Sequence, residues 1–248
     1  MSDKRMNDAG LAEGSRDGRV SGVEVKEKVI GLVSGGIDSP VAICLAAKGF
    51  EVIPLHFCLY PLSSRESSLK AIETLRDLKS EINFEKAIIY PWAGILKEIR
   101  SEVRDGYSCV ACRRSMLLTA SEIGKQEGAG GIVTGEALGQ KASQTLENLA
   151  ATSANIELPL LRPLIGMNKQ EIIGISKEIG IWKPDHAGCC LATPQKPRTR
   201  AEPEEVAREM KKINLQKLIK ESEEHSLSVK NLSEIPEDYF FEIAGKFG

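Results

Sequence analysis

Short apolar runs alternate along most of this chain with segments whose apolar residues recur at helical spacing. The runs predict buried strands at residues 29–33, 52–57, 87–90, 131–134 and 158–161. The helical spacing predicts helices at residues 40–48, 93–103, 113–126 and 203–224, a helix through Leu69, Ile72, Leu75 and Leu78, and another that starts at Asn168 and ends at Gly180. This alternation indicates a parallel sheet covered by helices, with ligands at the carboxyl ends of its strands.

The two ends of the chain differ from its middle. Residues 1–27 lack apolar periodicity, so little would offset the entropy lost on ordering, and we expect a flexible tail. Residues 28–200 carry the alternating pattern and form the predicted α/β domain. Residues 201–248 are expected to be a helical C-terminal extension. The length of 248 residues suits one domain with an appendage better than two equal domains.

The hexapeptide Ser-Gly-Gly-Ile-Asp-Ser at residues 34–39 joins the first predicted strand to the first predicted helix. Two adjacent glycines let an anion approach the backbone N–H groups, and the helix that follows presents its positive end. The loop lacks the lysine that ends a Walker A motif. An ordinary glycine turn is the alternative, but the order of strand, double glycine, serines and helix favours a phosphate-binding loop.

Charge and hydropathy restrict the partners. A formal net charge of −2 gives no overall basic field that would bind nucleic acid, so any RNA contact is expected to be local. Basic side chains cluster at Arg113 and Arg114 and again at Lys196, Arg198 and Arg200, although most such clusters are ordinary solvated surface. No apolar run approaches the roughly 20 residues that cross a bilayer, and the N-terminus lacks a secretion signal. We therefore expect a cytoplasmic protein with no membrane contact.

Six cysteines in such a chain are more plausibly reduced, catalytic or metal-bound than paired in disulfides. Cys44 and Cys58 fall in apolar segments, which favours core packing. Cys109 and Cys112 precede a predicted helix, whose dipole favours thiolates, and the pair at 189–190 offers a third sulfur. Three thiolates fit zinc with His186 as fourth ligand, an iron–sulfur cluster with one open iron, or a redox pair with a persulfide carrier. Sequence leaves all three readings open.

Residues 134–149 are dense in hydroxyls, amides and glycines where a strand ends and a helix begins. They would make a poor core. A capped helix with a polar face is one explanation, but a wall of a nucleotide and substrate cleft is favoured because ligands bind at strand ends.

Three segments together resemble a known family: residues 36–42, 134–149 and 161–173 are similar to the catalytic domain of tRNA 4-thiouridine synthetase, ThiI, over about residues 28–200. The resemblance implies a PP-loop ATPase fold (adenine nucleotide alpha hydrolase-like), a doubly wound parallel sheet with helices on both faces. It implies that Ser34, Gly35, Gly36, Asp38 and Ser39 hold the pyrophosphate of ATP and Mg²⁺, and that His56, Gly135 and Gln140 line the nucleotide site. Arg113 matches a functionally important basic position that is lysine in well-known members.

The resemblance also concerns sulfur chemistry. The chain resembles members in which two cysteines and one later cysteine bind a [4Fe-4S] cluster, here Cys109 and Cys112 with Cys190, or with Cys189 one residue earlier. Zinc stays the alternative metal. The implied reaction is ATP-dependent sulfur transfer to a tRNA uridine through an adenylated intermediate, with release of pyrophosphate and AMP. Asp38, Arg113 and the three cysteines would be catalytic.

Further partners follow from the same resemblance. The tail of 27 residues has no room for the family's RNA-binding THUMP domain, and no rhodanese domain follows residue 200. The implied partners are tRNA, a sulfur donor (sulfide or a persulfide carrier protein), a separate THUMP-type protein and a second copy of the chain in a homodimer. Two rival functions stay open: another PP-loop adenylating enzyme, acting on a small molecule or 2-thiolating tRNA, and a non-catalytic nucleotide-binding sulfur-carrier subunit.

Overall fold

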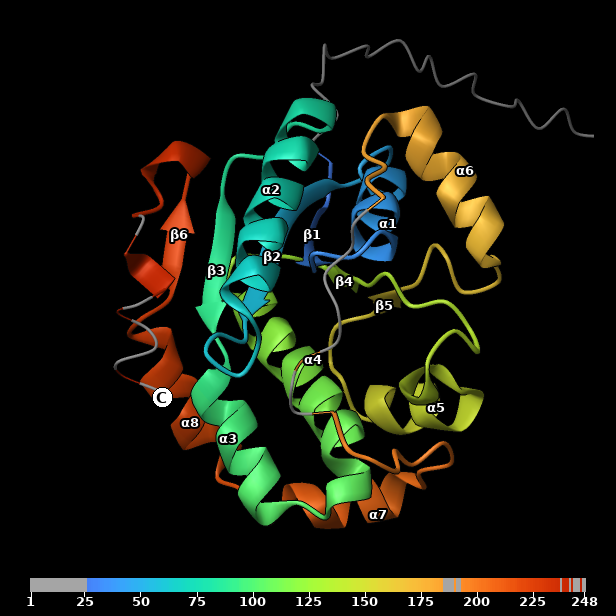
Figure 1. The fold of residues 1–248 in the computed structure, drawn as a ribbon, viewed down its shortest axis with the longest axis vertical. Helices are drawn as coiled ribbons and strands as arrows, with labels where there is room; N and C mark the ends of the chain where they lie inside the picture. Colours follow the sequence, from blue (N-terminus) through green and yellow to red (C-terminus); the bar gives the residue numbers. More distant parts are fainter. Residues whose placement is uncertain are drawn as a thin grey trace, which may run out of the picture.

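The protein folds around one six-stranded sheet, seen in a computed structural model that describes residues 26–184, 190, 193–236, 238–240, 242 and 246. Most of the expected N-terminal tail lies outside the described residues. The strands are β1 (Lys28–Val33), β2 (Glu51–Cys58), β3 (Ala87–Pro91), β4 (Gly131–Val133), β5 (Leu160–Leu161) and β6 (Leu227–Val229). Their order across the sheet is β5-β4-β1-β2-β3-β6 (Figure 1).

All neighbouring strands run parallel except β6, which pairs antiparallel with β3. The predicted parallel α/β fold is therefore confirmed, with an antiparallel edge strand added. The prediction of a purely helical extension over residues 201–248 was wrong at Leu227–Val229. A run of three residues is too short to show a strand period, and only pairing with β3 makes it a strand.

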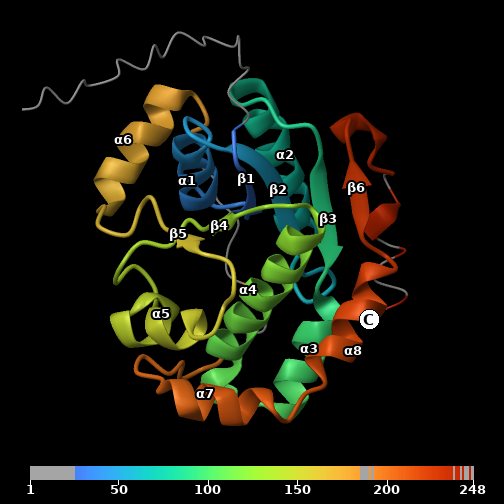
Figure 2. The ribbon, with the colours of Figure 1, turned by 180° about the vertical axis from the view of Figure 1, so that it is seen from behind.

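Helices cover both faces of the sheet, as Figures 1 and 2 show from opposite sides. One face packs against α1 (Asp38–Ala46), α2 (Arg65–Glu81) and α6 (Lys169–Ile179). The other packs against α3 (Ala93–Glu102), α4 (Ser108–Gln126), α5 (Leu146–Ser153), α7 (Pro203–Met210) and α8 (Leu215–Glu223). Among the described residues, no helix is long and apolar enough to cross a membrane.

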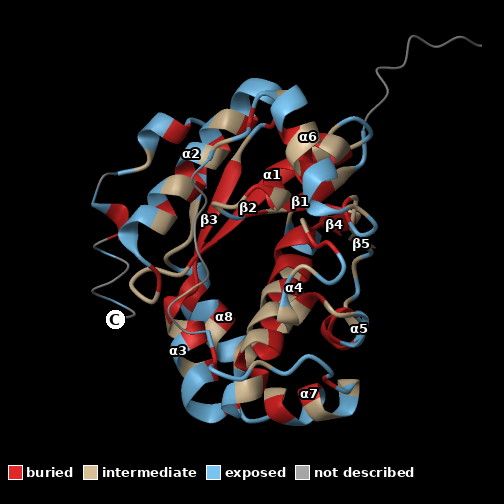
Figure 3. Cartoon of the chain, turned by 45° about the vertical axis from the view of Figure 1, so that its right-hand side comes forward, coloured by how far each residue is buried: buried red, intermediate tan, exposed pale blue. Residues whose placement is uncertain are grey.

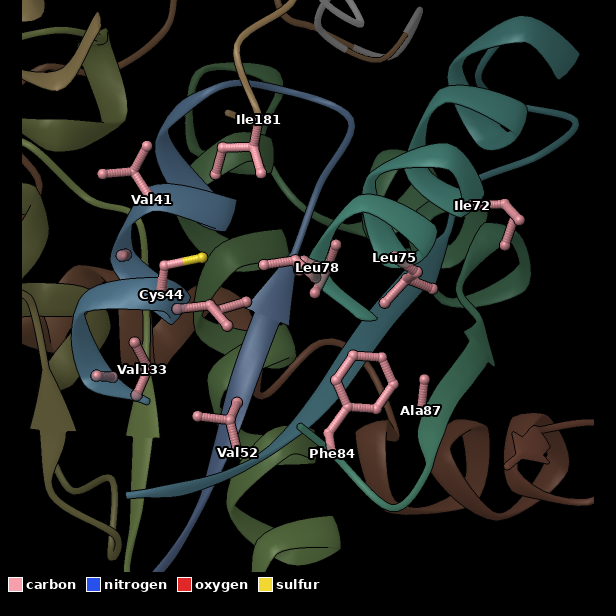
Figure 4. Close-up of a cluster of buried hydrophobic side chains, with 14 of the residues drawn as sticks. Val41, Cys44, Val52, Ile72, Leu75, Leu78, Phe84, Ala87, Val133 and Ile181 are labelled. Atoms are coloured by element: carbon pink, nitrogen blue, oxygen red, sulfur yellow. The ribbon is translucent and has the colours of Figure 1, made fainter. Parts of the chain in front are cut away.

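The period-two geometry of strands divides the apolar residues between these two cores. In β1, Val29 belongs to the cluster with α1 and α2, whereas Ile30 belongs to the cluster with α3 and α4. Figure 4 shows part of the first cluster, with Leu75 and Leu78 of α2 near Phe84 and Val52. Figure 3 shows the strands buried, with exposed residues on α2, α3, α6 and α7, whereas α1 is almost entirely buried.

Two helix boundaries differ from the predictions. α4 begins at Ser108 and not at residue 113, so Cys109 and Cys112 lie in its first turns. The predicted helix over residues 203–224 is two helices. The first ends at Met210, and the second, α8, begins after Asn214, whose side chain caps it by accepting a hydrogen bond from the Lys217 N–H. Both helices still bury one apolar face.

The predicted start and end of α6 are confirmed. The Asn168 side chain accepts hydrogen bonds from the backbone N–H groups of residues 170 and 171, and the Glu171 carboxylate accepts one from the Asn168 N–H. Gly180 ends the helix at φ 83°, in the left-handed region that favours glycine. This cap fixes the position of Lys169, the first residue of α6.

The chain changes direction across the sheet at β1. The connection after β1 leads to β2 on one side, whereas β4 lies on the other side of β1. Between the carboxyl ends of two such strands an open α/β sheet leaves a crevice for ligands. The loop at residues 34–37, which follows β1, and Thr134 and Gly135, which follow β4, meet at this position.

Candidate active site

The loop between β1 and α1 is closed by its two serines. The Ser34 N–H donates to Ser39 Oγ at 2.9 Å, and the two hydroxyl oxygens lie 3.1 Å apart. The Gly36 N–H donates to Ser34 Oγ at 3.4 Å. Ile37 at the N-cap has no polar side chain to cap α1, so N–H groups of the first turn are left for a ligand. This is the geometry of an anion-binding loop.

Gly135 lies against the start of α1. A Cβ on Gly135 would stand 2.6 Å from the backbone N and Cα of Ser39 and 2.7 Å from the carbonyl carbon of Asp38. Only glycine therefore lets the end of β4 approach the loop this closely. Gly135 thus lies beside the loop, and its role in the nucleotide site stays a prediction.

Asp38 does not stand alone at the loop. Its Oδ1 lies 2.6 Å from Lys169 Nζ, at the start of α6. Asp38 is 19% exposed and Lys169 is 45% exposed, so the pair faces solvent in part. Sequence reasoning missed Lys169, because its position after the Asn168 cap indicates a helix start and gives no sign of a partner 131 residues away.

Arg113 is held by a buried carboxylate. Arg113 Nε donates to Glu136 Oε1 at 2.6 Å, and Arg162 Nε donates to Glu136 Oε2 at 2.6 Å. Thr134 Oγ1 also donates to Glu136 Oε2, at 2.9 Å. Burial alone would raise the pKa of Glu136, but the two guanidinium groups and these hydrogen bonds lower it below its usual value. Glu136, fully buried, was not predicted from the sequence.

Three pockets at or near the loop between β1 and α1 share lining residues, and a fourth, of about 250 Å³, is lined by Gly35, Gly36, Ile37 and Pro40 together with residues of α2. The loop pocket, with a volume of about 110 Å³, is lined by Leu32, Ser34, Asp38, Ser39, Arg113, Gly135, Lys141 and Gln144. The histidine pocket, of about 180 Å³, has Ser34, Gly35, Gly36, His56, Phe57, Lys141 and Cys190 among its lining residues. The cysteine pocket, of about 470 Å³, has Leu59, Cys109, Cys112, Arg113, Met116, Lys141 and Cys190 among its lining residues.

Shared residues connect these pockets into one region. Lys141 lines all three, Arg113 lines the loop and cysteine pockets, and Cys190 lines the histidine and cysteine pockets. The structure therefore brings together the phosphate-type loop and three sulfur atoms from two distant parts of the chain.

His56, which was predicted to line the nucleotide site, lines the histidine pocket beside Gly35 and Gly36. His56 Nδ1 lies 3.1 Å from the Val33 carbonyl oxygen, so Nδ1 carries the proton and Nε2 is a buried acceptor with no partner among the described residues. Burial lowers the pKa of His56, although the Val33 bond opposes this, so the ring is neutral. Gln144 lines the loop pocket, whereas Gln140 is not among the residues lining it. The role of Gln140 stays a prediction, and Gln144 is a second candidate for it.

The cysteine pocket holds Cys112 against an indole. Trp92 Nε1 donates to Cys112 Sγ at 3.2 Å, and Trp92 itself is fully buried. Burial raises the pKa of Cys112 to about 12, although the Trp92 hydrogen bond opposes this. A metal-free Cys112 is therefore a neutral thiol at neutral pH and a poor nucleophile.

The donor set around this pocket can be compared with two kinds of metal group. In the described part of the chain, no three His, Cys, Asp or Glu side chains are grouped as the ligands of a single metal ion. A cubane cluster has four irons, so its cysteine ligands stand further apart than those of one zinc ion. Three sulfur donors around one largely apolar pocket suit a [4Fe-4S] cluster or zinc, because both take thiolate ligands. Cys189 and His186 lie outside the described residues.

The remaining predicted features have structural explanations. Cys44 and Cys58 are buried in the core, as expected. Arg114 Nη1 donates to the carbonyl oxygens of Ala151 and Ala154 at 3.2 and 2.5 Å, where it caps the end of α5. Asn148 Nδ2 donates to the Arg198 carbonyl oxygen at 2.8 Å, so part of the polar block at 134–149 connects α5 to the segment around residue 198.

Comparison with known proteins identifies the family. A family model described as "Thiamine biosynthesis protein (ThiI)" matches residues 24–215. The chain belongs to the ThiI family. The predicted resemblance is thereby confirmed.

Relatives of this ThiI-family chain include two proteins named "Probable tRNA sulfurtransferase". One, from Methanocaldococcus jannaschii, is 38% identical over 199 residues, and one from Thermus thermophilus is 40% identical over 190 residues. The matches cover 76% and 73% of this chain but 50% and 46% of the relatives. The chain thus spans about half the length of the curated relatives it matches.

A solved structure described as a 4-thiouridine synthetase–RNA complex with bound ATP matches the fold. It has a TM-score of 0.74 and 34% sequence identity, and the match covers 82% of this chain and 55% of that chain. The predicted PP-loop fold of the ThiI family is therefore confirmed. The roles assigned to individual residues stay predictions.

Proposed function

We propose that this protein uses ATP to transfer sulfur to a uridine of tRNA, forming 4-thiouridine. The observation that carries the proposal is that the loop pocket and the cysteine pocket share Arg113 and Lys141. This supports one reaction centre with phosphate-binding groups on one side and sulfur atoms on the other. The names of the relatives and of the RNA-bound structural neighbour support tRNA as the substrate class.

Activation of the uridine comes first, because its carbonyl oxygen is a poor leaving group. O4 attacks the α-phosphorus of ATP, the bond to the bridging oxygen of the β-phosphate breaks, and pyrophosphate leaves while the N3 proton passes to solvent. Ser34, Gly36 and Ser39 would bind pyrophosphate through the loop. Asp38 would hold Mg²⁺ through its carboxylate, and Lys169 lies where it can contact the same phosphates.

Sulfur insertion completes the reaction. Hydrosulfide attacks C4, the C4–O bond breaks, and AMP leaves with the former uridine oxygen. Hydrosulfide brings sulfur at the oxidation level of the product, so this route needs no reductant, whereas a persulfide carrier protein would need a thiol to reduce it. A [4Fe-4S] cluster held by Cys109, Cys112 and Cys190 would leave one iron open to bind sulfide.

Location in the cytoplasm, a separate THUMP-type partner and a homodimer stay predictions.

The test uses anaerobically prepared protein with ATP, magnesium, sulfide and a tRNA transcript. We expect AMP and pyrophosphate in equal amounts and 4-thiouridine by mass spectrometry of the digested RNA. Asp38→Asn should abolish release of both AMP and pyrophosphate. Formation of ADP in place of AMP would contradict the proposal.

The same assay separates the rival functions. AMP release that does not depend on tRNA would indicate adenylation of a small molecule. ATP binding without turnover would indicate a nucleotide-binding subunit. Sulfur at C2 of uridine in place of C4 would indicate a 2-thiolating enzyme.

A further inference from the structure

Glu136 stands out among the buried charged groups of the described chain because it binds two arginines at once. It is fully buried, and each of its carboxylate oxygens accepts a hydrogen bond from a different guanidinium group at 2.6 Å. Arg162 is fixed in turn by a 2.6 Å bond from its Nη2 to Ser153 Oγ. Bonds of this kind are short and strong, so the group is rigid.

The three charges do not cancel. Two guanidinium groups and one carboxylate leave one net positive charge in a site that is largely shielded from water. Arg113 is 30% exposed and Arg162 is 18% exposed, whereas Glu136 is 0% exposed. The net positive charge is therefore most accessible at Arg113, which lines the loop pocket and the cysteine pocket.

The chemistry of the proposed function requires an anion at that side. In the proposed reaction the α-phosphate lies between two groups. On one side it is bonded to the pyrophosphate that the loop holds, and on the other side it becomes bonded, through O4, to the uridine carbon that sulfur attacks. Arg113 lines both the loop pocket and the cysteine pocket. Lys141 also lines both pockets, but its side chain is exposed and no buried carboxylate orients it.

We propose that Glu136 and Arg162 are positioning residues that fix the Arg113 guanidinium for the α-phosphate of ATP and for the AMP that leaves. This inference rests on the proposed function and deepens it. Arg113 acts on the phosphate directly, whereas Glu136 acts through Arg113. Pyrophosphate, held by the loop near Ser34 and Ser39, does not depend on Glu136.

The chain offers a matched control in Glu209 on α7. Glu209 is also buried, at 3% exposure, and also binds two cations, with 2.6 Å to Arg104 Nε and 2.7 Å to Lys212 Nζ. It lines none of the three pockets. Glu209→Gln therefore removes a comparable buried carboxylate away from the site.

The experiment measures the dissociation constants of AMP and of magnesium pyrophosphate by calorimetry, with thermal unfolding of each variant. For Glu136→Gln we expect AMP to bind about 10- to 100-fold more weakly, the range for losing a charged hydrogen bond. Pyrophosphate affinity should be unchanged. Glu209→Gln should lower thermal stability and leave both affinities unchanged.

A double-mutant cycle tests whether Glu136 acts through Arg113. Arg113→Gln should weaken AMP at least as much as Glu136→Gln, and adding Glu136→Gln to Arg113→Gln should cause no further loss. Glu136→Gln leaves two arginines without their carboxylate partner, whereas the double variant leaves only Arg162 so. If Glu136→Gln alone does not fold, equal AMP affinity in Arg113→Gln and in the double variant still tests the proposal.

Four results would overturn the inference. Equal AMP affinity in wild type and Glu136→Gln would remove the positioning role. Equal loss of AMP and pyrophosphate affinity, or additive losses in the cycle, would indicate a general structural role. A wild-type protein that binds neither AMP nor pyrophosphate would overturn the proposed function as well, and this distinguishes the two failures.

Discussion

Replacing Gly135 by alanine tests how closely β4 and the phosphate-type loop must approach. The added Cβ would lie 2.6 Å from backbone atoms of Ser39, where ordinary contact begins at 3.4 Å. The two segments must therefore separate by about 0.8 Å, since backbone atoms at the start of a helix cannot turn aside as a flexible side chain can. The hydrogen bonds that close the loop between Ser34 and Ser39 would be strained by the same movement.

The magnitude follows from this displacement. Overpacking of this kind costs about 1–3 kcal/mol of folding stability, which corresponds to a fall of roughly 2–12 °C in Tm for a chain of this size. A shift approaching 1 Å in groups that align a substrate can reduce the rate by about 100-fold. We therefore expect Gly135→Ala to fold, with a modestly lower Tm and a rate of AMP release reduced by about two orders of magnitude.

The assay compares initial rates of ATP-dependent AMP release with thermal unfolding curves. Gly174→Ala is the matched control, because a Cβ at this position in α6 meets nothing within 4 Å. It should keep full activity and gain about 0.5–1 kcal/mol, since alanine is the better helix former. If Gly135→Ala keeps the wild-type rate and Tm, the loop does not need this contact and the reasoning fails.

Three further predictions concern single side chains. Lys169→Met should weaken magnesium pyrophosphate binding by about 10-fold, because a cation beside Asp38 is lost; unchanged calorimetric affinity would show that Lys169 serves only the ion pair. Cys109→Ala and Cys112→Ala should each release pyrophosphate at the wild-type rate but form no 4-thiouridine, and thiolation by either variant would exclude that sulfur from the reaction. Burial would raise the pKa of Glu209, but hydrogen bonds from Lys212 and Arg104 lower it to about 2. Because a depressed carboxylate pKa adds stability that is lost as pH falls toward that pKa, Glu209→Gln should flatten the loss of stability in acid, and an unaltered acid transition would contradict this.

The local pattern of the chain determined much of this protein. Strands β1 to β3 were predicted nearly to the residue, because buried strands are continuous apolar runs and need no distant information. The capping box at Asn168 and the left-handed Gly180 were also predicted, since caps depend on residues within one turn. The glycine loop followed from its own six residues, and three motifs together indicated the ThiI family.

Tertiary structure decided which distant side chains meet. Lys169 forms an ion pair with Asp38, 131 positions earlier in the chain. Cys190 lines the same pocket as Cys109 and Cys112. Glu136 binds Arg113 on α4 and Arg162, which follows β5. Such contacts depend on strand order and helix packing, which no local window of sequence contains. A residue type can suggest a role, but the residues of the proposed reaction centre meet only because the strand order brings the ends of β1 and β4 together, with α4 and α6 beside them.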